Sequence, residues 1–161
     1  MLDIIANNHW ERPIYFSGGA FGDDDYLWMK DYLQLDGVAY KLVPIKTPVD
    51  PRNSYQMGRI DSDKMYDIVM DWDWGESGNP DIYHDTETRR NSITYRSNLA
   101  RLADQLIKER QFDRAETILD LGMEKMPVDL FEYYSLLDPF VWNYYEIGAL
   151  EKARLVFEQT T

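Results

Sequence analysis

The feature that most constrains the fold is an arrangement of apolar and small residues that occurs twice in the second half of the chain. The matching alanines Ala115 and Ala153 are 38 positions apart, close to the repeat of about 34 residues that is typical of tetratricopeptide units. The matching positions are Leu99, Leu102, Ala103, Leu106, Ala115, Leu119, Gly122 and Pro127 in the first copy, and Leu137, Phe140, Val141, Tyr144, Gly148, Ala153 and Phe157 in the second. They predict two tetratricopeptide-like antiparallel helical hairpins over residues 92–161, the last one truncated. An ordinary antiparallel helical bundle is the alternative.

Small side chains allow the two helices of such a hairpin to pack closely. Ala103, Ala115 and Ala153 let the backbones approach, while larger neighbours interdigitate around them. The chain is expected to reverse direction at residues 110–113 and 148–151. We therefore expect all three alanines to be buried.

Proteins built from such repeats usually bind partners on the concave surface lined by the first helix of each hairpin. In the predicted register, the residues facing that surface are Ser97, Asp104 and Lys108 of the first hairpin and Asp138, Trp142 and Tyr145 of the second. An exposed aromatic pair gives a large contact area at a small entropic cost, so Trp142 and Tyr145 are the main candidates for partner binding. The alternative is that both aromatic rings pack against the first half of the chain or against a neighbouring repeat.

The first half of the chain predicts a small α/β segment. The expected elements are a helix over residues 2–8, a strand over 14–16, a helix from Tyr26 to Leu33, a strand over 38–45 and a helix over 61–72. A strand, a helix and a strand in one short unit predict a parallel pair of strands joined by a right-handed crossover.

The predicted fold class is therefore α+β and mostly helical. We expect a small α/β segment over residues 1–74, an irregular linker over 75–91 that packs on the body, and the helical hairpins over 92–161. Two strands alone make a marginal sheet. In addition, the chain opens inside an apparent helix and stops before the last repeat is complete. The pattern favours a piece of a larger protein.

The composition excludes several classes of function. The net charge is −12, which repels phosphate backbones, so no nucleic acid is expected as a partner. The sequence has no cysteine, which excludes thiolate metal sites and cysteine nucleophiles. A run of about 18 apolar residues is needed to span a membrane, and its absence predicts no direct membrane insertion by these residues.

A different hypothesis places a carbohydrate or divalent-metal site in the first half, around Arg12 and the carboxylates Asp23, Asp24 and Asp25. Clustered carboxylates suit hard cations, but acidic residues in the first turn of a helix are also favoured by the helix dipole without any ligand. The preceding glycines, Gly18, Gly19 and Gly22, match no nucleotide-binding fingerprint. The sequence predicts no cofactor.

Two further patterns are open to a chemical and a structural interpretation. Asp71 and Asp73 beside Trp72 and Trp74 have the composition of a sugar site, although Trp72 also belongs to the apolar stripe of a helix. A triad needs a base that is oriented by a carboxylate. The pair His84-Asp85 has that composition, but such a pair in a loop more often caps a helix. No catalytic residue is predicted.

Four stretches resemble the C-terminal region of a bacterial family of large multi-pass membrane proteins, grouped with GT-C-type (protein O-mannosyltransferase-like) glycosyltransferases. They are Trp10-Glu11-Arg12-Pro13-Ile14-Tyr15-Phe16, Gly22-Asp23-Asp24-Asp25-Tyr26, Tyr40-Lys41-Leu42-Val43-Pro44 and Asn91-Ser92-Ile93-Thr94-Tyr95-Arg96. The resemblance implies a water-exposed appendage on the extracytoplasmic (periplasmic) face of the inner membrane. The family's catalytic aspartate lies on a loop of the membrane domain, so the resemblance implies no catalytic residue here. It implies a non-catalytic accessory region of its parent membrane domain, which either recognises a protein partner or acceptor or stabilises that membrane domain.

Overall fold

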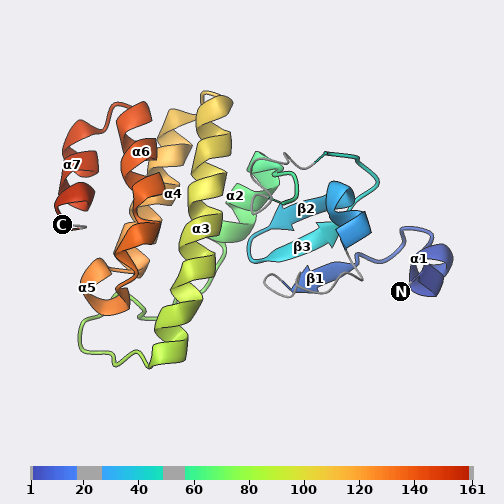
Figure 1. The fold of residues 1–161 in the computed structure, drawn as a ribbon, viewed down its shortest axis with the longest axis horizontal. Helices are drawn as coiled ribbons and strands as arrows, with labels where there is room; N and C mark the ends of the chain where they lie inside the picture. The colour runs from blue at the N-terminus through green and yellow to red at the C-terminus, as the bar shows by residue number, and fades with distance from the viewer. Residues whose placement is uncertain (1, 18–26, 49–56, 160–161) are drawn as a thin grey trace. The chain divides into compact units, whose positions relative to one another are not determined.

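The computed structural model describes residues 2–17, 27–48 and 57–159. Within it the chain forms two compact units, Met1–Asp61 and Ser62–Thr161. The first unit carries the sheet and the second is helical (Figure 1). The fold class is thus α+β and mostly helical, as predicted.

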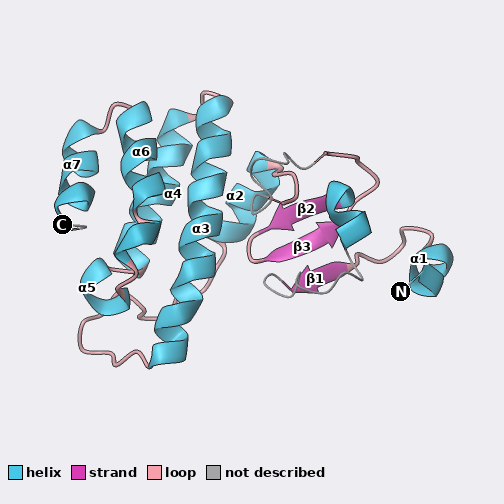
Figure 2. Cartoon of the chain, in the orientation of Figure 1, coloured by secondary structure: helices cyan, strands magenta, loops and turns pink. Residues whose placement is uncertain are grey.

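The first unit contains short elements around a three-stranded sheet (Figure 2). Its elements are α1 (Leu2–Asn8), β1 (Tyr15–Ser17), the 3-10 helix η1 (Leu27–Tyr32), β2 (Leu33–Asp36) and β3 (Ala39–Leu42). The strand order is β1-β3-β2, and β3 pairs antiparallel with both neighbours, so that Tyr40 lies opposite Phe16 on one side and Leu35 on the other. Met29, Leu33 and Leu35 are at most 1% exposed and form the core of this unit.

The predicted parallel crossover is wrong. The 3-10 helix η1 leads directly into β2, and β3 runs antiparallel to both β1 and β2, so the described strands form no parallel pair. The two-residue loop Gly37-Val38 then closes a hairpin between β2 and β3, because Gly37 adopts a φ of 70°. Leu33, which was expected to end the crossover helix, is instead the first residue of β2.

A buried polar chain holds β2 in this unit. The Arg59 guanidinium donates to the Gln34 carbonyl oxygen at 2.9 Å, and the Gln34 amide donates to Asp36 at 2.8 Å. The Tyr15 hydroxyl donates to the other oxygen of Asp36 at 3.3 Å. Gln34 and Asp36 are buried, so these bonds satisfy groups that would otherwise lose their hydration without replacement.

The second unit consists of two helical hairpins with a preceding helix. Its elements are α2 (Ser62–Met70), α3 (Thr86–Lys108), α4 (Phe112–Lys125), α5 (Val128–Phe131), the 3-10 helix η2 (Tyr134–Leu136), α6 (Asp138–Glu146) and α7 (Leu150–Glu158). Helices α3 and α4 form one hairpin, α6 and α7 form the other, and α3 packs against both α2 and α6 (Figure 1). The sequence prediction grouped α2 with the first segment, but its buried stripe of Met65 and Val69 packs in the second unit.

The alanines of the repeated pattern are buried, as predicted. Ala103 and Ala115 are 0% exposed and Ala153 is 6% exposed. Gly122 of α4 extends the pattern, because a Cβ placed there would lie 2.8 Å from Cε1 of Phe140 in α6. The hairpins therefore pack through positions where the side chain is small.

Helix α3 begins at Thr86, earlier than the predicted boundary at residue 92. Asp85 has an extended backbone and its side chain accepts a hydrogen bond from the Thr88 backbone N–H at 2.8 Å, which is an N-cap. The capped start adds the polar residues 86–91 to the helix. These residues resemble a linker by composition, which is why the boundary was misplaced.

The Asp85 cap predicts a pH dependence that Asp85→Asn reduces. The hydrogen bond from Thr88 lowers the pKa of Asp85. A carboxylate whose pKa is lower in the folded than in the unfolded chain stabilises the fold at pH values above its unfolded pKa. This stabilisation is lost as the pH falls through the folded pKa. Asparagine also caps helices but does not titrate.

Thermal unfolding at neutral and acidic pH is therefore expected to show a smaller acid-induced loss of stability for Asp85→Asn than for wild type. Asp85→Ala, which has no cap, is expected to be less stable than Asp85→Asn at both pH values. Equal acid-induced losses in wild type and Asp85→Asn would contradict the assignment.

The segment before α3 lies against the end of α4. The Ser77 hydroxyl donates to the Lys125 carbonyl at 2.8 Å, and a Cβ at Gly78 would clash with the Glu124 carbonyl oxygen. Tyr83, by contrast, is 86% exposed. Ser77 and Gly78 thus hold the start of this segment against the end of α4.

Candidate functional site

A large exposed hydrophobic surface of the second unit lies on the α6–α7 hairpin. Trp142 and Tyr145 project from α6 and are 62% and 61% exposed, with ring centroids 6.2 Å apart. They border a groove of about 440 Å³. The residues that line this groove are Val141, Trp142, Tyr145, Leu150, Ala153, Arg154 and Phe157. We call it the α6–α7 groove.

The structure separates the six predicted partner-binding residues into two groups. Trp142 and Tyr145 line the groove, and the exposed Asp138 lies one helical turn before Trp142 on α6. Ser97, Asp104 and Lys108 lie on α3 and do not line it. The last two form an ion pair of 2.6 Å within their own helix. The structure therefore does not bring the six residues together in one groove.

Sequence reasoning missed the α7 side of the groove. Leu150 is 57% exposed and Phe157 is 55% exposed. Both are apolar, but Ala153 and Val156 are the residues of α7 that turn toward the core. The sequence shows only that α7 has more large apolar residues than one buried face accommodates; which of them are exposed depends on how α7 packs.

The orientation of α7 is fixed by a polar cluster on its other side. The Lys152 ammonium contacts Glu116 and Asp120 of α4, each at 2.7 Å. The Tyr144 hydroxyl of α6 donates to the second oxygen of Asp120 at 2.8 Å. Hydrogen bonds to Asp120 and Glu116 raise the pKa of Lys152, and burial raises the pKa of Tyr144. Both groups therefore keep their protons at neutral pH, and the cluster ties the second hairpin to the first.

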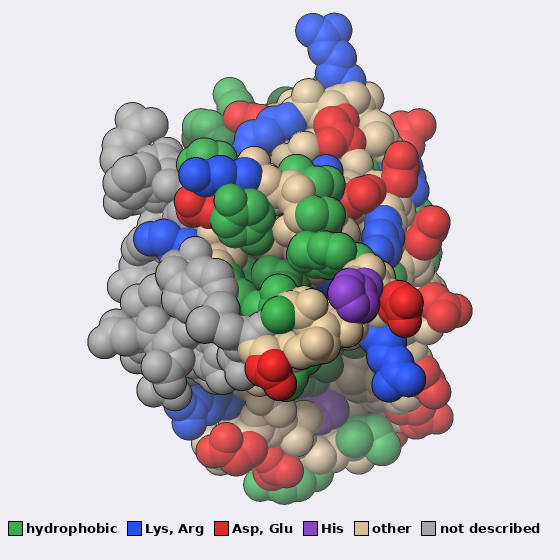
Figure 3. Space-filling view, turned by 90° about the vertical axis from the view of Figure 1, so that its right-hand side faces the viewer, with side chains coloured by type: hydrophobic (Ala, Val, Ile, Leu, Met, Phe, Trp, Pro, Cys, Tyr) green, Lys and Arg blue, Asp and Glu red, His purple; other side chains and the backbone are tan. Residues whose placement is uncertain are grey.

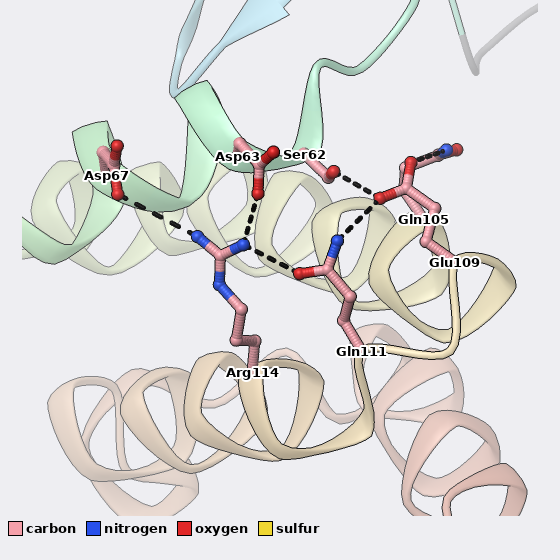
Figure 4. Close-up of polar contacts among 7 residues, drawn as sticks. All are labelled: Ser62, Asp63, Asp67, Gln105, Glu109, Gln111 and Arg114. Atoms are coloured by element: carbon pink, nitrogen blue, oxygen red, sulfur yellow. Dashed lines mark hydrogen bonds and ion pairs between the residues drawn. The ribbon is translucent and has the colours of Figure 1, made fainter.

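A second polar network, drawn in Figure 4, joins α2 to the turn between α3 and α4. The residues in it are Ser62, Asp63, Asp67, Gln105, Glu109, Gln111 and Arg114. The Arg114 guanidinium pairs with Asp63, lies 3.9 Å from Asp67, and stacks 4.0 Å from the Tyr66 ring centre. Glu109 accepts from the Ser62 hydroxyl and from two glutamine amides.

This network is structural, although it contains a serine bonded to a carboxylate. Ser62 is buried, so a substrate cannot reach its hydroxyl. The Glu109 carboxylate accepts hydrogen bonds on both oxygens and has no neighbouring histidine among the residues drawn. The arrangement therefore positions α2 and lacks the nucleophile and base that acyl transfer needs.

The predicted ligand site of the first half lies mostly outside the described residues. Asp23, Asp24 and Asp25 lie outside the described residues, as do Gly18, Gly19 and Gly22. Arg12 is exposed, and its backbone carbonyl accepts from the Asn8 amide at 2.7 Å. Within residues 2–17, 27–48 and 57–159, no three potential ligands of the His, Asp and Glu types come together to hold a metal ion. On the face drawn in Figure 3, acidic, basic and hydrophobic side chains are interspersed.

The two tryptophans considered for sugar binding pack against each other. Trp72 meets Trp74 and Tyr95 edge to face, with ring centroids 5.3 Å apart in both pairs. Trp74 and Tyr95 are separated by 5.6 Å. Asp73 accepts from the backbone N–H of Gly75 at 2.9 Å. A sugar platform needs a ring face that is open to the ligand, whereas all three of these rings are half-buried and meet one another.

The His84-Asp85 pair has structural roles. One ring nitrogen of His84 lies 2.9 Å from the Ser77 carbonyl oxygen, and the ring packs on Phe131 with centroids 4.5 Å apart. Asp85 caps α3. The two side chains thus serve separate local contacts.

The family comparison adds an observation on the first unit. Residues 1–64 match the family model named TMEM260-associated domain 2. This name refers to a membrane protein family, and the match ends within the first turn of α2, before the helical hairpins begin. No curated protein and no solved structure matches the chain. Among the described residues, no helix is both long enough and apolar enough for a membrane crossing.

Proposed function

We propose that the chain is a non-catalytic interaction region of a membrane-bound, GT-C-type glycosyltransferase-like protein. In this proposal the second unit is a tetratricopeptide-like module that binds a protein partner or acceptor through the α6–α7 groove. The match of residues 1–64 to a domain named for a membrane protein family supports the membrane-bound parent. The sequence resemblance supports the glycosyltransferase class and the extracytoplasmic side.

The observation that carries the proposal is the exposed apolar surface of the α6–α7 hairpin. Trp142, Tyr145, Leu150 and Phe157 are each more than half exposed and line one groove. Contiguous apolar surface of this kind marks interaction sites in folded proteins. Tryptophan and tyrosine also dominate the binding energy of protein interfaces, since they desolvate a large area and lose few rotamers.

The tetratricopeptide interpretation rests on the geometry of the two hairpins. Each pairs two helices through buried small residues, and the equivalent alanines, Ala115 and Ala153, are 38 positions apart. Repeats of this class present binding surfaces because each hairpin contacts only its neighbours. Small residues are also buried between the helices of an ordinary helical bundle. The functional proposal therefore depends on the α6–α7 groove and not on whether the hairpins are tetratricopeptide repeats.

Site-specific photo-crosslinking in the full-length protein tests this function. A photoreactive phenylalanine at Trp142 is expected to form a covalent adduct with a second protein in native membranes. The matched control is the same residue at Tyr83, an exposed aromatic position outside the groove. The adduct at Trp142 is expected to decrease when Tyr145→Ala is added, because the partner loses an anchor. Adduct formation only within the parent chain, or equally from both positions, would reject the proposal.

A further inference from the structure

We propose that the α6–α7 groove binds an amphipathic α-helix that carries lysine or arginine beside its apolar stripe. This inference rests on the proposed function and specifies the chemistry of the partner. It is carried by the shape of the groove and by the charges around it.

The groove fits a helix better than an extended peptide. Its walls are α6 and α7, each of 9 residues, which corresponds to about 14 Å of helix. Extended peptides that bind as β-strands add to a sheet edge, and the described part of the second unit consists of helices, turns and loops. A bound helix satisfies its own backbone groups and needs only an apolar floor. Val141, Ala153 and Phe157 contribute to that floor.

The border of the groove is acidic. On α6, Asp138 and Glu146 lie one turn before and one turn after Trp142, and both are exposed. On α7, the exposed Glu151 lies three residues before Arg154. No described residue forms an ion pair or hydrogen bond with the side chains of Asp138, Glu146 or Glu151. These three carboxylates are therefore available to a basic partner.

The basic residue that lines the groove, Arg154, already forms an ion pair within its own helix. The Arg154 side chain lies 3.2 Å from Glu158 one turn later on the same helix. The other cation of α7, Lys152, is held by Glu116 and Asp120 on the far side. The field at the groove is thus set by the unpaired carboxylates, and charge complementarity favours a cationic helix.

The same charges disfavour a second copy of this chain as the occupant. Two copies meeting through this face would bring Asp138, Glu146 and Glu151 toward their own counterparts, and like charges facing each other oppose association. The whole chain carries a net charge of −12, which adds to the repulsion. We therefore expect the isolated chain not to dimerise through this surface.

Three designed peptides of about 14 residues, near the shortest length that forms a helix alone, test the inference against the 161-residue chain. The first has leucines at helical spacing flanked by lysines, the second has glutamates in place of the lysines, and the third has the composition of the first in an order without an apolar stripe. Fluorescence anisotropy is expected to show binding of the first peptide alone at low salt. Equal binding of the first and third peptides would show that charge alone suffices and would overturn the inference.

Matched variants separate the groove from the general charge of the chain. Asp138→Asn, Glu146→Gln and Glu151→Gln together are expected to weaken binding of the lysine peptide about tenfold, and the difference is expected to shrink near 1 M salt. Asp71→Asn, Asp81→Asn and Asp129→Asn together remove the same charge elsewhere and are expected to leave the affinity unchanged. Trp142→Ser with Tyr145→Ser is expected to abolish binding while the chain stays folded by circular dichroism. Equal weakening by both charge variants would overturn the inference.

The outcomes also separate this inference from the proposed function. A protein adduct at Trp142 in the crosslinking experiment, together with no binding of the lysine peptide, would leave the interaction function intact and reject the basic helix. Sedimentation of the isolated chain as a dimer that Trp142→Ser dissociates would identify a second copy as the occupant and would also reject it.

Discussion

Replacing Arg96 by methionine is expected to lower the free energy of unfolding of the second unit by about 2–4 kcal/mol. Arg96 is 0% exposed. Its guanidinium donates to the Glu132 carbonyl at 2.5 Å and to the Met126 carbonyl at 2.8 Å. Burial lowers the pKa of Arg96 to about 10, so the side chain is charged at neutral pH. Methionine fills much of the volume but leaves both carbonyls without their donor.

The loop that Arg96 holds stores backbone strain, and release of this strain in the variant offsets part of the expected loss. Glu132 and Tyr133 adopt φ values of 59° and 57°, and residues other than glycine held in such conformations cost about 1–3 kcal/mol each. Met126 is the C-cap of α4, and Tyr133 leads into η2 and α6. The Arg96 guanidinium therefore fixes the connection between the two hairpins. Without it, the loop is expected to relax and the second hairpin to lose its fixed position on the first.

Chemical denaturation of Arg96→Met, followed by circular dichroism, measures this effect. Arg90→Met is the matched control, because Arg90 lies on the same helix with a side chain that is 67% exposed and 4.0 Å from its nearest ionic partner, Glu87. Surface substitutions of this kind change stability by about 0.5 kcal/mol or less. Equal midpoints for the two variants would show that Arg96 does not hold the loop.

The helical hairpins could be predicted because their information is local. Apolar residues at helical spacing define the buried faces, and the alanines mark the positions of close approach. The antiparallel pairing of the small sheet was not predicted. The helical spacing of Tyr26, Met29 and Leu33 indicated a helix before the second strand, whereas the two-residue turn after Asp36 makes Leu33 part of a β-hairpin. The turn prevailed, since a hairpin closes over a shorter stretch of chain than a crossover.

The candidate site was predicted in part for a similar reason. The exposure of Trp142 and Tyr145 follows from the register of α6, whereas the contribution of Leu150 and Phe157 depends on how α7 packs against α4 through Lys152. Tertiary contacts of that kind are not encoded in spacing. Arg96 was missed because arginine is rarely fully buried, and its two carbonyl partners lie 30 and 36 residues later in the chain.

Substituting Gly122 by leucine is expected to destabilise the second unit by about 3 kcal/mol. A Cβ at this position lies 2.8 Å from Cε1 of Phe140 and 3.2 Å from Cδ1 of Leu99. Both neighbours are 0% exposed, so neither side chain can move into solvent. Leucine favours helix by about 1 kcal/mol over glycine, but this gain is smaller than the cost of forcing α4 away from α3 and α6.

Thermal unfolding of Gly122→Leu, compared with Thr117→Leu at an exposed position of the same helix, separates packing from helix propensity. The control is expected to change stability by about 0.5 kcal/mol or less. Adding Phe140→Leu to Gly122→Leu vacates part of the contested space, so the double variant is expected to lose less stability than the sum of the two single variants. Strict additivity would show that the residues at positions 122 and 140 do not contact each other. The close approach of the two hairpins at Gly122 would then no longer explain why a glycine stands in the middle of α4.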